Sequence, residues 1–147
     1  MSSIANASRG YRGYIASRPV LGSRAPQHVQ NLVIRDYAQR TGLLFKLSAT
    51  EYVMPGCYMI LEGVLEELPT LDGIILYTLF MLPRRRDRRL AIYERVLAAG
   101  AVLHTAVEGM VLRERADIAK FEDIWGVHQA LERAQGFGPV PRGDDSE

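Results

Sequence analysis

The feature that most constrains the fold of this chain is an almost unbroken apolar run at residues 74–81 (IILYTLFM). A short apolar run without polar alternation is typical of a strand buried on both faces, as in parallel sheets. Three further strand candidates occur along the sequence, at residues 13–16, 43–47 and 101–107. Parallel strands need a crossover segment between them, and a helix is the usual one. The run therefore predicts helices between the strands.

The segments between these strands carry apolar residues at helical spacing. Pro26 opens the first segment, because the first helical position needs no N–H, and Gly42 stands where a helix commonly ends. The spacing predicts helices within residues 26–42, 58–69, 83–100 and 117–135. This alternation predicts an α/β fold, with one mostly parallel four-stranded sheet flanked by helices and a long C-terminal helix.

The totals of the chain fit a single domain. It has 147 residues, of which 48% are hydrophobic, and 18 Lys and Arg against 17 Asp and Glu. We expect residues 1–12 to be a flexible arm, 13–136 the α/β domain and 137–147 a disordered tail. Cys57 cannot form an internal disulfide, and no run has the length of a secretory signal or a membrane span. We therefore expect a cytoplasmic protein with no membrane insertion.

Polar side chains follow the strands, where parallel sheets bind their ligands. The candidate ligand-binding residues are Ser17, Arg18, Arg24, Gln27, Asn31, Ser48 and Tyr77. The arginines have the planar fork that suits phosphate or carboxylate, and the amides suit sugar hydroxyls. The candidate catalytic residues are Glu51, Glu108 and Tyr52, where a glutamate would move a proton and the phenol would assist.

Each of these assignments has a structural alternative. Ser17 can be a plain strand-end serine, and Arg18 can pair with an acidic side chain. The segment 48–52 can form a turn, and Tyr77 can be a core residue with a satisfied hydroxyl. The arginines within residues 84–89 favour a solvated helix face over contact with a polyanion, because six helical residues cover more than one turn.

No built-in cofactor or metal is expected. The histidines His28, His104 and His128 and the single cysteine show no spacing of metal ligands. The sequence also lacks a glycine-rich phosphate loop. The apolar stripe of Ile118, Phe121 and Trp125 predicts a helix that either packs on the sheet or forms a dimer seam.

The run GYIASR, a helix with Gln27 and Asn31, and the segments 72–84 and 94–109 resemble the catalytic domain of serine recombinases. The resemblance spans about residues 13–109 and implies a resolvase-like, or more broadly flavodoxin-like, sheet. It also implies a homodimer, because the long helix of that family serves dimerisation. The family places its serine four residues after the strand tyrosine, whereas Arg18 occupies that position here. Its Asp-Arg-Leu-x-Arg motif is absent, so recombination and a nucleic-acid partner are not expected.

The segments GYIASRP, RAPQHVQNLVIRDY, LSATEY and DGIILYTLFMLP also resemble a small family of proteins encoded in sporadic bacterial carbohydrate-biosynthesis clusters. This resemblance implies a role in making a surface sugar or glycoconjugate. We therefore expect a protein that binds a phosphorylated sugar or sugar nucleotide and modifies it. The alternative is a non-catalytic dimeric accessory module for an enzyme of that pathway.

Overall fold

The computed structural model describes residues 8–17, 25–51 and 57–135. The strands are β1 (Tyr11–Ala16), β2 (Phe45–Glu51), β3 (Gly73–Leu76), β4 (Val102–Thr105) and β5 (Met110–Leu112). The helices are α2 (Gln27–Thr41), α3 (Met59–Glu66), α4 (Arg86–Ala98) and α5 (Asp117–Ala134), with 3-10 turns η1 (Leu68–Thr70) and η2 (Leu79–Met81). The expected arm and tail lie largely outside the described residues, and the boundaries at 12 and 136 stay predictions.

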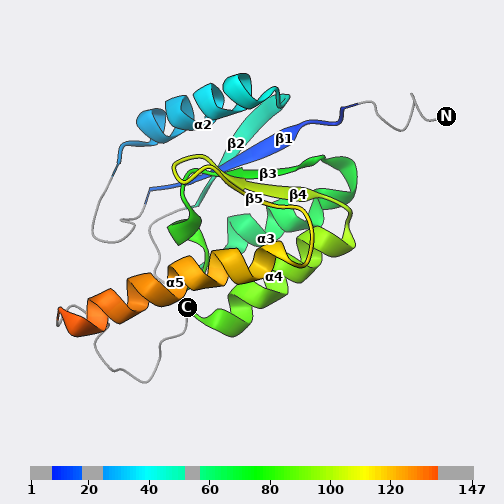
Figure 1. Ribbon diagram of the computed structural model, residues 1–147. Coiled ribbons are helices and arrows are strands. Elements are labelled where there is room, and N and C mark those ends of the chain that lie inside the picture. The colour runs from blue at the N-terminus through cyan, green and yellow to red at the C-terminus, as the bar shows by residue number, and fades with distance from the viewer. Residues whose placement is uncertain (1–7, 18–24, 52–56, 136–147) are drawn as a thin grey trace.

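The strands form one sheet in the order β2-β1-β3-β4-β5. The first four are parallel, and β5 runs antiparallel to β4. Helix α2 covers one face, and α3, α4 and α5 lie on the other (Figure 1). The expected α/β class is confirmed, but the sheet has five strands and not four. Gly109, at φ 69°, reverses the chain into β5, which at three residues is too short to show a period in the sequence.

Two strands end elsewhere than the sequence predicts. Strand β2 continues to Glu51, so that Ser48 and Glu51 belong to a strand and not to a loop. Strand β3 ends at Leu76, after which the chain turns into η2 and does not remain extended to residue 81. The hydroxyl of Thr78 accepts a hydrogen bond from the N–H of Phe80 at 3.4 Å, which supports this early turn.

Two close packings fix the sheet and its first helix. A Cβ atom at Gly73 would lie 1.8 Å from the carbonyl oxygen of Val102, so β3 and β4 approach each other too closely for a side chain here. Gly42 ends α2 in the left-handed region, at φ 74°, where its N–H and that of Leu43 bond to the last carbonyls of the helix.

The sheet separates two apolar cores. Between the sheet and α2 lie the buried side chains of Tyr11, Ile15, Ile34, Tyr37, Ala38, Ile75 and Ala106. The larger core on the other face includes Leu61, Val64, Leu65, Tyr93, Val96, Phe121 and Trp125. The stripe of the C-terminal helix therefore buries Phe121 and Trp125 within its own chain. None of the helices in the described segments is long and apolar enough to cross a membrane.

Candidate nucleic-acid interface

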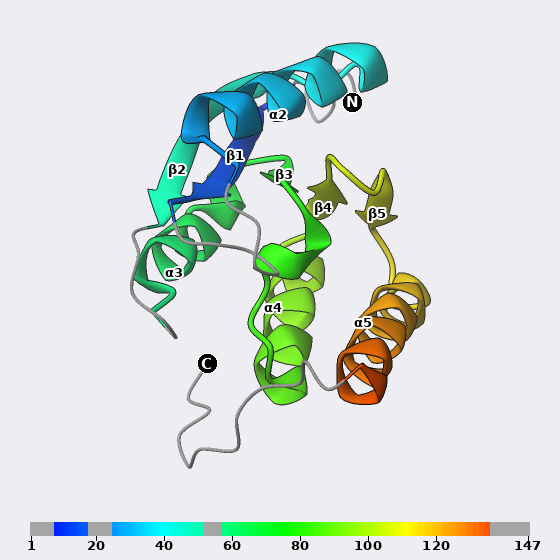
Figure 2. The same ribbon diagram turned by 90° about the vertical axis from the view of Figure 1, so that its left-hand side faces the viewer.

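The carboxyl ends of β1 to β4 meet at one edge of the sheet, which faces the viewer in Figure 2. Ser17 follows β1 at this edge. Its N–H donates to the carbonyl of Glu51 at 2.9 Å, and its hydroxyl donates to the same oxygen at 3.3 Å. This double contact extends the pairing of β1 with β2 by one residue. The candidates Arg18, Arg24 and Tyr52 lie outside the described residues.

Glu51 is buried and joins β2 to the start of α3. Its carboxylate accepts hydrogen bonds from the hydroxyl of Tyr14 at 2.7 Å and from the N–H groups of Ile60 and Leu61 at 3.1 and 3.0 Å. These two amides are among the donors that a first helical turn leaves without an internal partner. Glu51 therefore anchors α3 to the sheet, and a role in proton transfer stays a prediction.

Glu108 makes a similar connection after β4. One carboxylate oxygen accepts from the hydroxyl of Thr78 at 2.5 Å, and the other accepts from the N–H of Leu79 at 2.9 Å. The segment that follows β4 thereby holds the turn that follows β3. The two glutamates consolidate different turns of the same sheet edge, and catalysis by Glu108 is likewise untested.

Gln30 is a residue of this edge that was not among the predicted ligand-binding residues. Its side-chain oxygen accepts from the N–H of Ala16 at 3.0 Å, and its amide nitrogen donates to the carbonyls of Ala16 and Ala25, both at 2.8 Å. The side chain thus pairs with the end of β1 as a neighbouring strand would. Its spacing of four and seven residues from Ile34 and Tyr37 places it on the buried stripe of α2, and that signal was available in the sequence.

The remaining candidates within the described residues make no hydrogen bond or ion pair with Ser17. Gln27 is exposed at the first position of α2, and Asn31 is half-buried. Ser48 and Tyr77 are half-buried as well, and Ser48 packs so closely on Gly13 that a Cβ there would meet its hydroxyl at 2.3 Å. Within the described ranges, no group of three or more His, Cys, Asp or Glu side chains could hold a metal ion.

The arginine segment, residues 84–89, follows η2 and begins α4. Its guanidinium groups have different partners: Arg84 pairs with Glu132 at 2.9 Å, Arg85 with Asp87 at 2.7 Å and Arg86 with Glu122 at 3.6 Å, and Arg88 lies 5.1 Å from the ring centre of Tyr58. The side chain of Arg84 is 32% exposed, that of Arg85 51% and that of Arg86 70%. The exposed part of the segment thus presents several cations side by side.

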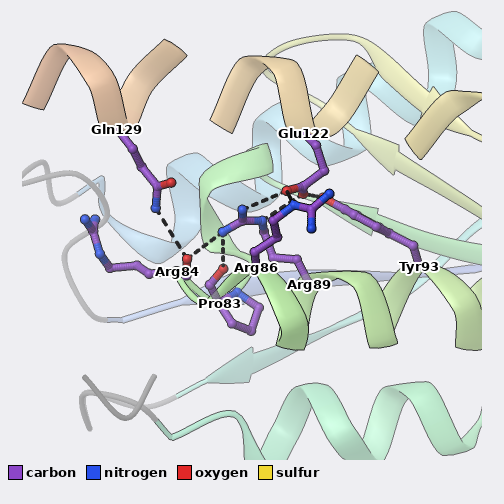
Figure 3. Close-up of polar contacts among 7 residues, drawn as sticks. All are labelled: Pro83, Arg84, Arg86, Arg89, Tyr93, Glu122 and Gln129. Carbon is purple, nitrogen blue, oxygen red and sulfur yellow. Dashed lines mark hydrogen bonds and ion pairs between the residues drawn. The ribbon is translucent and has the colours of Figure 1, made fainter. Parts of the chain in front are cut away.

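Arg89 departs from the expected solvated face, because its side chain is only 2% exposed. Figure 3 shows its guanidinium between α4 and α5, with Nε and Nη2 each 2.8 Å from the carboxylate of Glu122. Its Nη1 donates to the carbonyls of Pro83 at 3.2 Å and Arg84 at 2.6 Å. The group also lies 4.3 Å from the ring centre of Trp125. Arg89 therefore ties α5 to the loop that precedes α4.

Glu122 stays charged in this half-buried position. Burial opposes its ionisation, but hydrogen bonds from Arg89 and from the hydroxyl of Tyr93, at 2.7 Å, outweigh burial and lower the pKa of the carboxyl below its usual value. The same environment raises the pKa of the Tyr93 phenol, through burial first and its bond to Glu122 second. The cluster is a closed ion-pair network at neutral pH.

The fold is similar to that of recombinase catalytic domains. The chain resembles the N-terminal catalytic domain of TP901-1 integrase with a TM-score of 0.59 and 15% identity, over 84% of this chain and 98% of that one. It resembles a resolvase family site-specific recombinase from Streptococcus pneumoniae with a TM-score of 0.59 and 11% identity, over 86% and 93%. No protein-family model and no curated protein matches the sequence. The likeness confirms the expected resolvase-like fold.

These comparisons overturn the expected function. The expectation of a carbohydrate-biosynthesis protein with a sugar or sugar-nucleotide ligand was wrong, as was its alternative, an accessory module for such a pathway, because the neighbours are an integrase domain and a site-specific recombinase. The expectation that nucleic acid is not a partner was wrong for the same reason. It rested on the register around Ser17 and on the absent Asp-Arg-Leu-x-Arg motif, which concern catalysis and leave the fold unchanged. The comparisons give the expected homodimer no support.

Proposed function

We propose that this protein binds duplex DNA through the exposed part of its arginine segment. The observation that carries the proposal is the exposure of Arg85 and Arg86 at the start of α4, on a fold shared with an integrase catalytic domain and a site-specific recombinase. Guanidinium groups bind phosphate through paired hydrogen bonds, and phosphate contacts supply most of the affinity of DNA-binding proteins. The partner of this surface is accordingly the DNA backbone.

The charge of the segment supports the proposal. Its residues 84–89 comprise five arginines and one aspartate, a formal surplus of four positive charges within six positions. The chain as a whole has a formal net charge of +1, so this surplus is a local feature and not a property of the entire surface. A local surplus of this kind binds a polyanion at one face of the molecule.

The start of α4 supports it as well. The helix has 13 residues, and no side chain caps its first turn at Arg85. The first N–H groups of a helix and the positive end of its dipole favour a phosphate oxygen there. Arg85 and Arg86 flank this position, so one phosphate can meet both backbone and side-chain donors.

The proposal concerns binding and not strand cleavage. The hydroxyl of Ser17 donates to the backbone carbonyl of Glu51. The carboxylate of Glu51 accepts hydrogen bonds from Tyr14 and from the first turn of α3. A serine nucleophile needs a base within hydrogen-bond reach, and the contacts of Ser17 within the described part of the chain are to the backbone of Glu51.

The test is fluorescence anisotropy of a labelled duplex of roughly 20 base pairs, titrated with protein between about 50 and 200 mM salt. We expect salt-dependent binding by the unmodified chain. The variant R85Q/R86Q should bind at least about tenfold more weakly, with the slope of log K against log salt reduced by about two. The control R40Q/R115Q removes two arginines that are 61% and 70% exposed and pair with acids elsewhere, and it should change affinity by less than about twofold. Equal losses in both variants, or no binding at the lowest salt, would refute the proposal.

A further inference from the structure

Helix α5 places two carboxylates on the arginine segment. Glu132 meets Arg84 through two contacts, Oε1 to Nη2 at 2.9 Å and Oε2 to Nη1 at 3.4 Å. Glu122 lies 3.6 Å from Nε of Arg86 while it binds Arg89. Gln129, one turn before Glu132, also donates to the carbonyl of Arg84 at 3.4 Å (Figure 3). Helix α5 therefore holds the segment from outside α4 through residues of both its first and its last turns.

The contact between Glu132 and Arg84 uses the same donors that a phosphate would use. A two-pronged carboxylate and a phosphate both pair with the planar guanidinium fork. The two side chains are 17% and 32% exposed, so their attraction is less screened than that of a surface pair. The hydrogen bond from Arg84 lowers the pKa of the Glu132 carboxyl below its usual value, which keeps the competing charge present at neutral pH.

Only one of the two glutamates can leave its arginine at small cost. Glu122 is the partner of the buried Arg89 and of Tyr93, so its departure would leave a buried cation without a counter-ion. Glu132 has no such role, because it otherwise contacts His128, one turn earlier on α5, at 3.1 Å. The guanidinium of Arg84 can therefore exchange the carboxylate of Glu132 for an anion from outside the protein.

We propose that Glu132 is an autoinhibitory group, which occupies the guanidinium of Arg84 and so lowers the affinity of the arginine segment for a DNA phosphate. The inference rests on the proposed function, because it assumes that this segment binds DNA. When a phosphate displaces the carboxylate, Glu132 remains beside His128 and α5 keeps its attachment through Glu122 and Arg89. Anything that moves the last turns of α5 then changes the affinity for DNA.

The experiment compares E132Q with the unmodified chain in the anisotropy titration. Glutamine keeps the size and one acceptor oxygen of the side chain but removes the charge. We expect the Kd of E132Q to fall by about three- to tenfold. The slope of log K against log salt should become steeper by about one, which corresponds to one additional phosphate contact. The control E94Q also removes one negative charge, from an exposed pair with Arg115 elsewhere on the molecule, and it should change the Kd by less than about twofold.

The double variant R84Q/E132Q identifies the arginine, because it should lose the gain of E132Q. An equal Kd for E132Q and the unmodified chain would overturn the inference while the proposed function stands. An equal gain in affinity in E94Q would show that the effect comes from the net charge of the protein. A gain in affinity that persists in R84Q/E132Q would show that Arg84 is not the arginine involved. Either result also overturns the inference. If neither the unmodified chain nor E132Q binds DNA, the proposed function fails and the inference fails with it. Circular dichroism melting of each variant verifies that all are folded.

Discussion

The substitution R89M is expected to destabilise the fold more than a change at any exposed arginine. It removes a guanidinium that is 2% exposed and leaves the carboxylate of Glu122, at 11% exposure, without its main counter-ion. The carbonyl of Pro83 loses this donor, the carbonyl of Arg84 keeps only its contact with Gln129, and the ring of Trp125 loses its cation. Breaking a buried ion pair on one side costs about 3–5 kcal/mol. We expect a loss of about 4 kcal/mol in the free energy of unfolding.

The double variant R89M/E122Q separates the cost of the unpaired charge from the loss of packing. Glutamine remains an acceptor for the hydroxyl of Tyr93 but carries no charge that burial would penalise. We therefore expect the double variant to recover about half or more of the loss in R89M. R89K keeps the charge but not the planar fork of the guanidinium, so its free energy of unfolding should lie between those of R89M and R89M/E122Q.

Urea unfolding followed by fluorescence measures these free energies. Trp125 is the single tryptophan and is 1% exposed, so its emission reports the docking of α5. A loss below about 1 kcal/mol in R89M would refute the view that this ion pair holds α5 in place. A double variant less stable than R89M would refute the assignment of the cost to an unpaired Glu122.

Two further predictions concern the sheet. Burial first, and the charge of Arg113 second, lower the pKa of His104 from 6.5 to about 4. The unfolded state therefore binds the proton first, and the free energy of unfolding falls by about 3 kcal/mol as the pH falls from 6.5 towards 4. Urea titrations at pH about 7.5 and 4.5 should show this loss in the unmodified chain and not in H104F. G73A should lower the free energy of unfolding by at least about 3 kcal/mol, because its Cβ would meet the carbonyl of Val102. G63A, in open space on α3, should instead stabilise the protein by up to about 1 kcal/mol. Thermal melting compares the two variants, and equal melting temperatures would contradict the packing described for β3.

Much of this architecture could be predicted from the sequence, because its largest signals are local. The apolar run at 74–81 and the helical stripes between the strands define a parallel sheet with crossover helices. Strand β5 could not be predicted, since three residues show no period and it exists only through pairing with β4. The side chain of Glu51, at the end of β2, bonds to Tyr14, which lies 37 residues earlier, and to the first turn of α3, ten residues later, and neither contact can be inferred from the local pattern of residues 43–51.

The candidate site was harder to predict, because it depends on which arginine points inward. The sequence shows five arginines in six positions, but the partner that buries Arg89 is Glu122, 33 residues later. The positions of Arg89, Tyr93 and Val96 do share one stripe of α4, so the spacing held part of the answer. The search for a serine-recombinase register around Ser17 addressed catalysis, and it led away from the nucleic-acid partner that we propose.

In the function we propose, the arginine segment is the surface that contacts DNA. The most direct measurement is arginine-specific footprinting: the chain is modified with phenylglyoxal with and without saturating duplex, and each site is quantified by mass spectrometry. Arg85 and Arg86 should be protected by DNA, whereas Arg40 and Arg115, which are 61% and 70% exposed, should react equally in both samples. Protection of Arg40 or Arg115 with no protection of Arg85 and Arg86 would contradict the claim.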